Sequence, residues 1–320
     1  MSKKTKIWLI VATSLVVIGL MVFASVMSLY NWDFNKLSTV KYETNTYNLN
    51  EEFSNISINT DTSDISFVLS DDGVSKAVCY ETEKLKHSVA VQNGTLKVNL
   101  VDEREWYEHI GITIGTEKIT LYLSKKEYDS LVIKEDTGDI KIPKEFSFKN
   151  IDISASTGDV KSFASVLDKI KIKVSTGYIH LQNLSADSLD LTASTGNVNL
   201  SDIICDNEIK INLSTGKTSI ADVKCKNITS NGDTGDILLQ NVIAKEKLSI
   251  DRSTGDVRFQ KCDADEIFIK TDTGDVKGNL LTDKVFITQS DTGRIDVPKT
   301  TTGGKCEIST DTGDIVVKIH

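Results

Sequence analysis

Apolar and polar residues alternate on both sides of a Thr-Gly pair that recurs ten times at near-constant spacing between residues 137 and 313. Apolar residues stand seven and five positions before most of these glycines and two and four positions after them. Exceptions include Thr218, Ser230 and Thr288. A period of two indicates strands with one buried face, whereas a helical repeat needs roughly 10–12 residues of period 3.6.

The Thr-Gly pairs are spaced so evenly that they predict a repeat architecture. Their glycines follow one another at intervals of 19 or 20 residues: Gly138, Gly158, Gly177, Gly196, Gly216, Gly235, Gly255, Gly274, Gly293 and Gly313. We therefore expect an all-β, single-stranded β-solenoid of about ten coils over residues 131–320. Each coil contains a strand, the Thr-Gly corner, a short strand and a third side, and stacking the coils creates the core.

The N-terminal region contains an uncharged run from Ile7 to Tyr30, and Lys3, Lys4 and Lys6 precede it. As a helix, 24 residues would span about 36 Å, which is enough to cross a membrane. The run is longer than the apolar region of a signal peptide. We expect an uncleaved transmembrane helix over residues 7–30, with a cytoplasmic tail over residues 1–6 and an extracellular C-terminal domain.

Residues 31–130 are β-rich but less regular, and we expect them to cap the rod. The segment from Asp61 to Ile65 resembles a decayed copy of the corner, since Ser63 stands 75 residues before Gly138. A polar and aromatic loop at residues 103–109 contains Trp106 and Tyr107. These two rings are candidate ligand contacts, although covering the end of the rod is the alternative interpretation.

Charge and cysteine usage narrow the function classes. The chain has 46 acidic and 37 basic residues and a net charge of −9, which argues against a nucleic-acid partner. Cys205 and Cys225 occupy a position that is Ala in neighbouring coils, so we expect packed, reduced thiols. The four histidines are scattered along the sequence, which gives no support to a zinc or Ser-His-Asp site. We predict no cofactor.

The corner aspartates allow two sharper interpretations. Five copies read Asp-Thr-Gly, the triplet of aspartic proteases, but a protease needs two such loops facing each other across a cleft. Stacked carboxylates could instead bind calcium, although solvated turn residues are the simpler alternative. The weak calcium candidates are Asp233, Asp236, Asp256, Asp272 and Asp275.

A carbohydrate-active enzyme is the main rival class, because polysaccharide lyases also use parallel β-helices. Their sites combine carboxylates with basic residues on long protruding loops. Here Arg252 and Arg258 flank Asp256, but the even spacing leaves no room for an insertion between Gly138 and Gly313. An isolated basic pair on a rod is usually a surface ion pair. We therefore predict no catalytic residues.

Two segments that lead into the repeats carry a family resemblance. Residues 119–123 (ITLYL) and 128–133 (YDSLVI), followed by Thr-Gly-Asp coils, resemble the bacterial "putative adhesin" domain family of unknown function, which also occurs in LiaG-like membrane proteins. The resemblance covers roughly residues 50–320. It implies a β-solenoid displayed at the cell envelope and transfers no catalytic residue. Ser124 stands where the family usually has a proline.

Together these observations predict a non-enzymatic, membrane-anchored binding or scaffold protein. The candidate partners are a cell-envelope protein, a wall polymer or a cationic peptide, for which an acidic rod is suited. A carbohydrate-active enzyme acting on envelope polysaccharide remains the alternative. End-to-end stacking of solenoids into a homopolymer is a third possibility.

Overall fold

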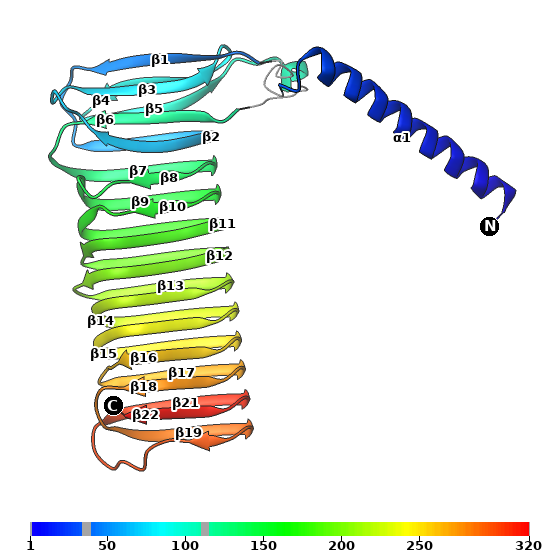
Figure 1. Ribbon diagram of the computed structural model, residues 1–320. Helices are drawn as coiled ribbons and strands as arrows, with labels where there is room; N and C mark the ends of the chain where they lie inside the picture. Colours follow the sequence, from blue (N-terminus) through cyan, green and yellow to red (C-terminus); the bar gives the residue numbers. More distant parts are fainter. Residues whose placement is uncertain (1, 34–39, 110–114, 320) are drawn as a thin grey trace.

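The computed structural model describes residues 2–33, 40–109 and 115–319 as a long helix and a rod-shaped stack of strands (Figure 1). Helix α1 (Lys3–Leu29) begins at Ser2, whose hydroxyl accepts a hydrogen bond from the Thr5 amide. The large apolar side chains from Ile7 to Phe23 are exposed. The helix is long and apolar enough to cross a membrane, and such a helix serves as a membrane anchor or as a signal sequence.

In the described part of the chain, twenty-two strands form one sheet that winds along the rod. The first six are β1 (Tyr42–Leu49), β2 (Asn55–Leu69), β3 (Ser75–Thr82), β4 (Leu85–Gln92), β5 (Thr95–Asp102) and β6 (Glu117–Leu123). The others are β7 (Glu127–Thr137), β8 (Ile140–Ile142), β9 (Ser147–Thr157), β10 (Val160–Ser162), β11 (Ser165–Ala186), β12 (Ser188–Cys205), β13 (Glu208–Thr215), β14 (Thr218–Thr234), β15 (Ile237–Thr254), β16 (Val257–Cys262), β17 (Glu266–Thr273), β18 (Val276–Leu280), β19 (Lys284–Thr292), β20 (Ile295–Asp296), β21 (Gly304–Thr312) and β22 (Ile315–Ile319).

Strand β12 shows how one coil is built. Its first side buries Leu189, Leu191 and Ala193, and its second side follows the Thr-Gly corner. A second corner occurs at Asp202, which adopts a left-handed conformation with φ of 54°. Asn or Asp occupies this corner in several coils, because short polar side chains tolerate that conformation better than most. The inward-facing residues form one continuous core, so the predicted β-solenoid is confirmed.

The Thr-Gly corner brings the backbones of neighbouring coils into close contact. A Cβ atom on Gly235, where φ is 130°, would lie 2.0 Å from the carbonyl oxygen of Gly216 in the preceding coil. Both the positive φ and this short distance require glycine. In the other coils, a Cβ atom on the corner glycine would likewise collide with a backbone carbonyl oxygen of the neighbouring coil.

The order of the coils departs from the order of the sequence at the C-terminal end. Strand β21 pairs with both β17 and β19, and β22 pairs with both β18 and β20. The last coil in the sequence therefore inserts between the two that precede it, and the coil of β19 and β20 forms the end of the rod (Figure 1).

The N-terminal end also joins distant segments. In β2, Thr62 pairs with Thr137 and Ile65 pairs with Ile140, so the decayed corner stacks directly on the first Thr-Gly corner. The cap consists of β1, which precedes β2 in the sequence, and of β3 to β6, which lie between β2 and β7. Strands β5 and β6 pair with β2 in parallel, whereas β4 pairs with β5, β3 with β6, and β1 with β3 in antiparallel fashion. Such a covering layer limits pairing between rods at this end.

All five cysteines are free and buried. Cys205 and Cys225 lie in a row with buried Ala186 and Ala244, as the shared small position predicts. Burial raises the pKa of the Cys225 thiol to about 12. Cys205 and Cys225 are therefore protonated packing groups at neutral pH.

A buried arginine explains two departures from the apolar pattern. Arg252 is 1% exposed, and its guanidinium donates to the Thr218 and Ser230 hydroxyls and to the Leu213 carbonyl. Gly232 leaves the space for it, because a Cβ there would lie 1.6 Å from Arg252 Nη1. Arg252 is thus not part of a surface ion pair as the sequence suggested, whereas Arg258 does pair with Asp256 at 2.7 Å. In the sequence, Arg252 stands six residues before Arg258, and this placement does not reveal that the Arg252 side chain enters the core.

The corner geometry predicts the effect of substituting its glycine. Gly235→Ala should lower the free energy of unfolding by about 3–5 kcal/mol, because the added methyl group collides with backbone and the φ is strained. Urea unfolding of the full chain in detergent micelles measures this change. Gly73→Ala is the matched control, since Gly73 has a φ of 74° but no atom within 4 Å of its Cβ position. It should cost about 1 kcal/mol, and equal effects would contradict the collision argument.

The Arg252 cluster predicts non-additive mutations. Arg252→Met alone should destabilise the rod by about 2–4 kcal/mol, because it strands the buried Ser230 and Thr218 hydroxyls. Adding Ser230→Ile and Thr218→Val restores the apolar pattern and should recover most of that loss. Urea unfolding tests both variants, with Arg258→Met as a surface control that should change stability by less than about 1 kcal/mol. A triple variant no more stable than Arg252→Met would refute this account.

Candidate binding groove

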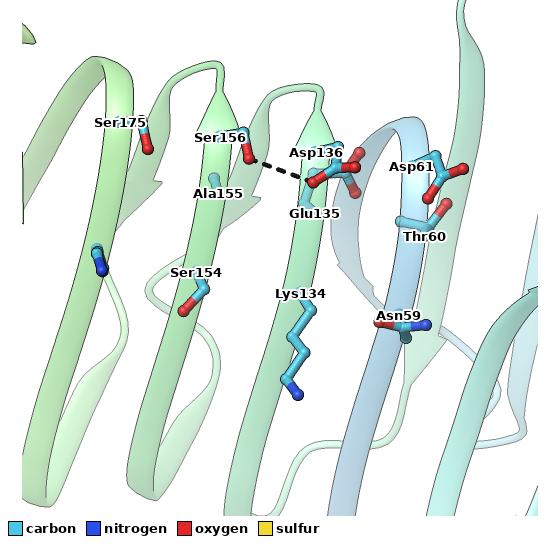
Figure 2. A pocket seen from close by; sticks show the side chains of 11 residues that line it. Asn59, Thr60, Asp61, Lys134, Glu135, Asp136, Ser154, Ala155, Ser156 and Ser175 are labelled. Carbon is cyan, nitrogen blue, oxygen red and sulfur yellow. Dashed lines mark hydrogen bonds between the residues drawn. The ribbon is translucent and has the colours of Figure 1, made fainter.

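One side of the rod has two hollows, where the first strands of several coils approach their corners. In most coils the residue three positions before the motif glycine is buried, and its two neighbours flank the hollow. One part has a volume of about 430 Å³ and is lined by Asn59, Thr60, Asp61, Lys134, Glu135, Asp136, Ser154, Ala155, Ser156, Lys173 and Ser175 (Figure 2). The next part has a volume of about 380 Å³ and involves equivalent positions from Thr192 to Ser253.

The two parts adjoin, because Lys173 of the first pairs with Thr192 of the second. We call them together the polar groove. Its walls are mainly hydroxyl, amide and carboxylate groups that repeat from coil to coil. In Figure 2, the Ser156 hydroxyl donates to Asp136 across neighbouring coils at 3.2 Å. The groove can therefore offer the same polar groups repeatedly to an elongated ligand.

A buried polar network lies beneath the N-terminal part of the groove. Glu135 is 3% exposed and accepts a hydrogen bond from the Ser63 amide at 3.1 Å. Thr60 lies 3.0 Å from His87 Nε2, and Nδ1 of that ring lies 2.8 Å from the Glu81 carboxylate. The network thus extends from the groove into the cap.

Burial changes the acid–base properties of this network. It raises the pKa of Glu135 to about 8 against the opposing effect of backbone hydrogen bonds. It also raises the pKa of Glu117 to about 7, although Arg104 acts in the other direction. Burial lowers the pKa of His87 despite its hydrogen bond to Glu81, which favours a neutral imidazole at neutral pH.

The calcium candidates fall into two separate rows. Asp236, Asp256 and Asp275 follow their glycines, and Asp256 and Asp275 each donate a backbone N–H to the carboxylate of the preceding member at 2.9 Å. Asp233 and Asp272 lie in the other row, with Ser253 in the coil between them. Among the described residues, the aspartates of these rows do not bring three ligand atoms together at one point. Calcium binding stays a prediction, while the coil-to-coil hydrogen bonds give the first row a structural role.

The candidate aromatic contacts lie away from the groove. Trp106 and Tyr107 belong to the short helix η2 (Trp106–His109) and are 76% and 55% exposed. Their rings meet edge to face with centroids 5.9 Å apart. Neither residue lines a part of the polar groove. Their role in binding stays a prediction.

A family model matches residues 53–207 and 204–320, which together span most of the chain, and its description is Toastrack DUF4097. The chain belongs to this Toastrack family. No curated protein is significantly similar to the Toastrack chain.

Solved structures that are similar to this chain include three proteins from bacteria. A "putative adhesin" from Bacteroides fragilis shares 17% identity, with 87% of this chain and 97% of that chain covered and a TM-score of 0.38. A "putative lipid binding protein" from Parabacteroides distasonis shares 16% identity, with coverage of 88% and 98% and a TM-score of 0.46. A "putative adhesin" from Parabacteroides merdae shares 15% identity, with coverage of 75% and 97% and a TM-score of 0.45.

The polar groove and the network beneath it were not predicted from the sequence. Glu135 occupies an inward-facing position before the corner that is apolar in several other coils. This charged residue at an apolar position was the signal in the sequence that could have revealed the network. Its partners Thr60 and Ser63 come from the decayed corner, and His87 comes from the cap. Their proximity follows from the stacking of β2 on β7, which the repeat spacing does not encode.

Glu135 predicts a pH-dependent stability. Below about pH 4.5 its carboxyl is protonated in both states and has no effect on stability. Between that value and about pH 8 it loses its proton only on unfolding, so the native state becomes less stable as pH rises. Glu135→Gln should therefore stabilise the chain at pH 8 and have little effect at pH 4.

Urea unfolding of the full chain in micelles across this pH range measures the difference. The slope of stability against pH should change by at most about 1.4 kcal/mol per unit. The exposed residue Glu145 provides the matched control, Glu145→Gln. Parallel pH profiles for Glu135→Gln and the unmodified chain would contradict the assignment of a protonated, buried Glu135.

Proposed function

We propose that this protein is a membrane-anchored, extracytoplasmic scaffold that holds an extended glycan of the cell envelope along its polar groove, without chemical turnover. The observation that carries the proposal is the repetition of polar groove positions from coil to coil. Stacked strands lie about 4.8 Å apart, so equivalent hydroxyl and amide groups recur at that interval. A linear glycan repeats its own hydroxyl groups on a similar length scale.

The composition of the groove also favours a glycan. Asn212 and Asn231 supply amides, and Ser194, Ser214 and Ser253 supply hydroxyl groups. These groups can both donate and accept hydrogen bonds, as sugar hydroxyls do. A single coil offers few contacts, but a ligand that follows several coils gains from their simultaneous engagement.

The location rests on the N-terminal helix. Its exposed apolar side chains and the preceding lysines support an uncleaved, single-pass anchor with a cytoplasmic N-terminus. The resemblance to LiaG-like membrane proteins is consistent with display at the envelope. The rod would then stand outside the cell, where wall polymers are accessible.

A carbohydrate-active enzyme remains the second candidate, because one observation favours it. Glu135 has a raised pKa and shares a hollow with Asp61 and Asp136. A protonated carboxyl near a second carboxylate is the arrangement that glycosidases use. Binding and turnover must therefore be measured on the same samples.

The test is co-sedimentation of the full chain, in detergent micelles, with purified wall sacculi. Replacing Ser194 and Ser214 by Tyr fills the groove in adjacent coils and should weaken binding at least tenfold. The control replaces Asn199 and Ser219 by Tyr, since these residues pair in adjacent coils on another side of the rod. The control should bind within about twofold of the unmodified chain.

Three outcomes would overturn the proposal. Equal binding by the groove and control variants would place the ligand elsewhere on the rod. Binding of a cationic peptide or an envelope protein without any sacculus binding would replace the glycan with another partner. Release of new reducing ends that disappears in Glu135→Gln would establish the enzyme.

A further inference from the structure

Three side chains with metal-ligating atoms meet inside the cap. Cys79 and Glu81 lie on β3, and His87 lies on β4. The thiol sulfur, a carboxylate oxygen and a ring nitrogen all lie within 4.8 Å of one another. All three residues are buried, with at most 2% exposure.

Local structure brings these residues together. Cys79 and Glu81 are two positions apart on one strand, so both side chains project from the same face. The chain then turns into β4, where the His87 amide donates to Glu81 Oε2 at 2.7 Å. The ring nitrogen Nδ1 lies 2.8 Å from that same oxygen. Oε2 and Nδ1 therefore face each other within the cluster.

The remaining atoms of these ligands are held by other groups. Glu81 Oε1 accepts hydrogen bonds from Asn45 Nδ2 at 2.7 Å and from the Tyr47 hydroxyl at 3.2 Å. On the far side of the imidazole, His87 Nε2 lies 3.0 Å from the Thr60 hydroxyl. Metal sites typically orient their ligands in this way, with hydrogen bonds to the atoms that do not contact the metal.

Glu117 provides an independent observation. It is 5% exposed, and its Oε2 has no hydrogen-bond partner among the described residues. The antiparallel register pairs Tyr80 with Lys118, so the next step along β3 and β6 places Glu117 opposite Glu81. A buried carboxylate oxygen without a partner is costly, and a cation bound beside it would offset that cost.

We propose that Cys79, Glu81 and His87 bind a zinc ion, and that the Glu117 carboxylate, which lies outside this group of three, moves in as the fourth ligand. A set of one sulfur, one nitrogen and carboxylate oxygens suits Zn²⁺, whereas calcium and magnesium prefer oxygen ligands alone. On binding, Cys79 gives its thiol proton to solvent and binds as the thiolate. Without the metal, Nδ1–H of neutral His87 donates to Glu81; on binding, the ring changes tautomer, so that Nδ1 supplies its lone pair to the metal and Nε2–H donates to Thr60.

Such a site would be structural rather than catalytic, because all of its ligands are buried. Zinc would join β3, β4 and β6 in the cap, where Cys79 is a free thiol. The proposal does not depend on the polar groove or its ligand. The two hypotheses can therefore fail separately.

The test uses Co²⁺ as a spectroscopic probe for zinc. The full chain in detergent micelles is unfolded with denaturant and a chelator, and then refolded with Co²⁺. We expect one Co²⁺ per chain, a sulfur-to-cobalt charge-transfer band in the near ultraviolet and the visible bands of a tetrahedral site. Zn²⁺ should displace the cobalt and raise the melting temperature.

Cys79→Ser should abolish the charge-transfer band and the zinc-dependent rise in melting temperature. Cys262→Ser is the control, since Cys262 is an equally buried thiol in the rod, and it should retain both signals. Glu117→Gln keeps the three other ligands, so it should retain the band but bind cobalt about tenfold more weakly.

The proposal is wrong if the refolded chain gives no sulfur-to-cobalt band, or if Cys79→Ser gives the same band as the unmodified chain. Unchanged cobalt affinity in Glu117→Gln would remove Glu117 from the ligand set. If Cys79→Ser does not fold, loss of the band in His87→Gln together with its retention in Cys262→Ser decides the question in favour of the site.

Discussion

The contact between neighbouring Thr-Gly corners is the constraint on which the rod depends. Each corner glycine lies so close to a carbonyl oxygen of the neighbouring corner that a methyl group would not fit, as at Gly235 and Gly216. This contact fixes the register of successive coils, and the register in turn aligns the apolar rows of all three sides. The hydrogen bonds along the Asp236–Asp256–Asp275 row follow from the same alignment. A polar groove with repeating walls is a further consequence of that register.

Most polar residues in the core are compensated by hydrogen bonds. Arg252 is accommodated because Ser230 and Thr218 accept its hydrogen bonds and Gly232 leaves space for it. At the cap, Glu81 is held by Asn45, Tyr47 and His87. Among the described residues, Glu117 in the cap and Glu135 in the first coil each retain one buried oxygen without a partner, and Arg252 Nε also has none. The uncompensated carboxylates therefore lie in the cap and the first coil, which makes this end of the rod chemically different from the later coils.

The sequence predicted the features that are encoded within one repeat. The period of two, the corner glycines and the small position of Cys205 each depend on neighbouring residues, and the structure confirms them. The sequence could not predict the order in which the coils stack. Because all coils have nearly the same width and apolar rows, β21 can insert between β17 and β19 as well as follow β19. For the same reason, β2 can stack on β7 across the whole cap. The cluster of Cys79, Glu81 and His87 has no motif spacing, because antiparallel pairing in the cap assembles it.

Positions that repeat in every coil and positions that break the repeat have different consequences for function. If the polar groove binds the proposed ligand, its repeated positions would provide many similar contacts, so no single coil would select the ligand and the affinity would depend on how many coils one molecule spans. Specific chemistry requires a place where the repeat is broken. In this chain that place is the first coil and its cap, where Glu135 and Thr60 line the groove and Thr60 also contacts His87. A polymer bound along the polar groove would therefore reach the distinctive end of the groove at the cap. The buried residues that influence the stability of this end of the rod lie beside it.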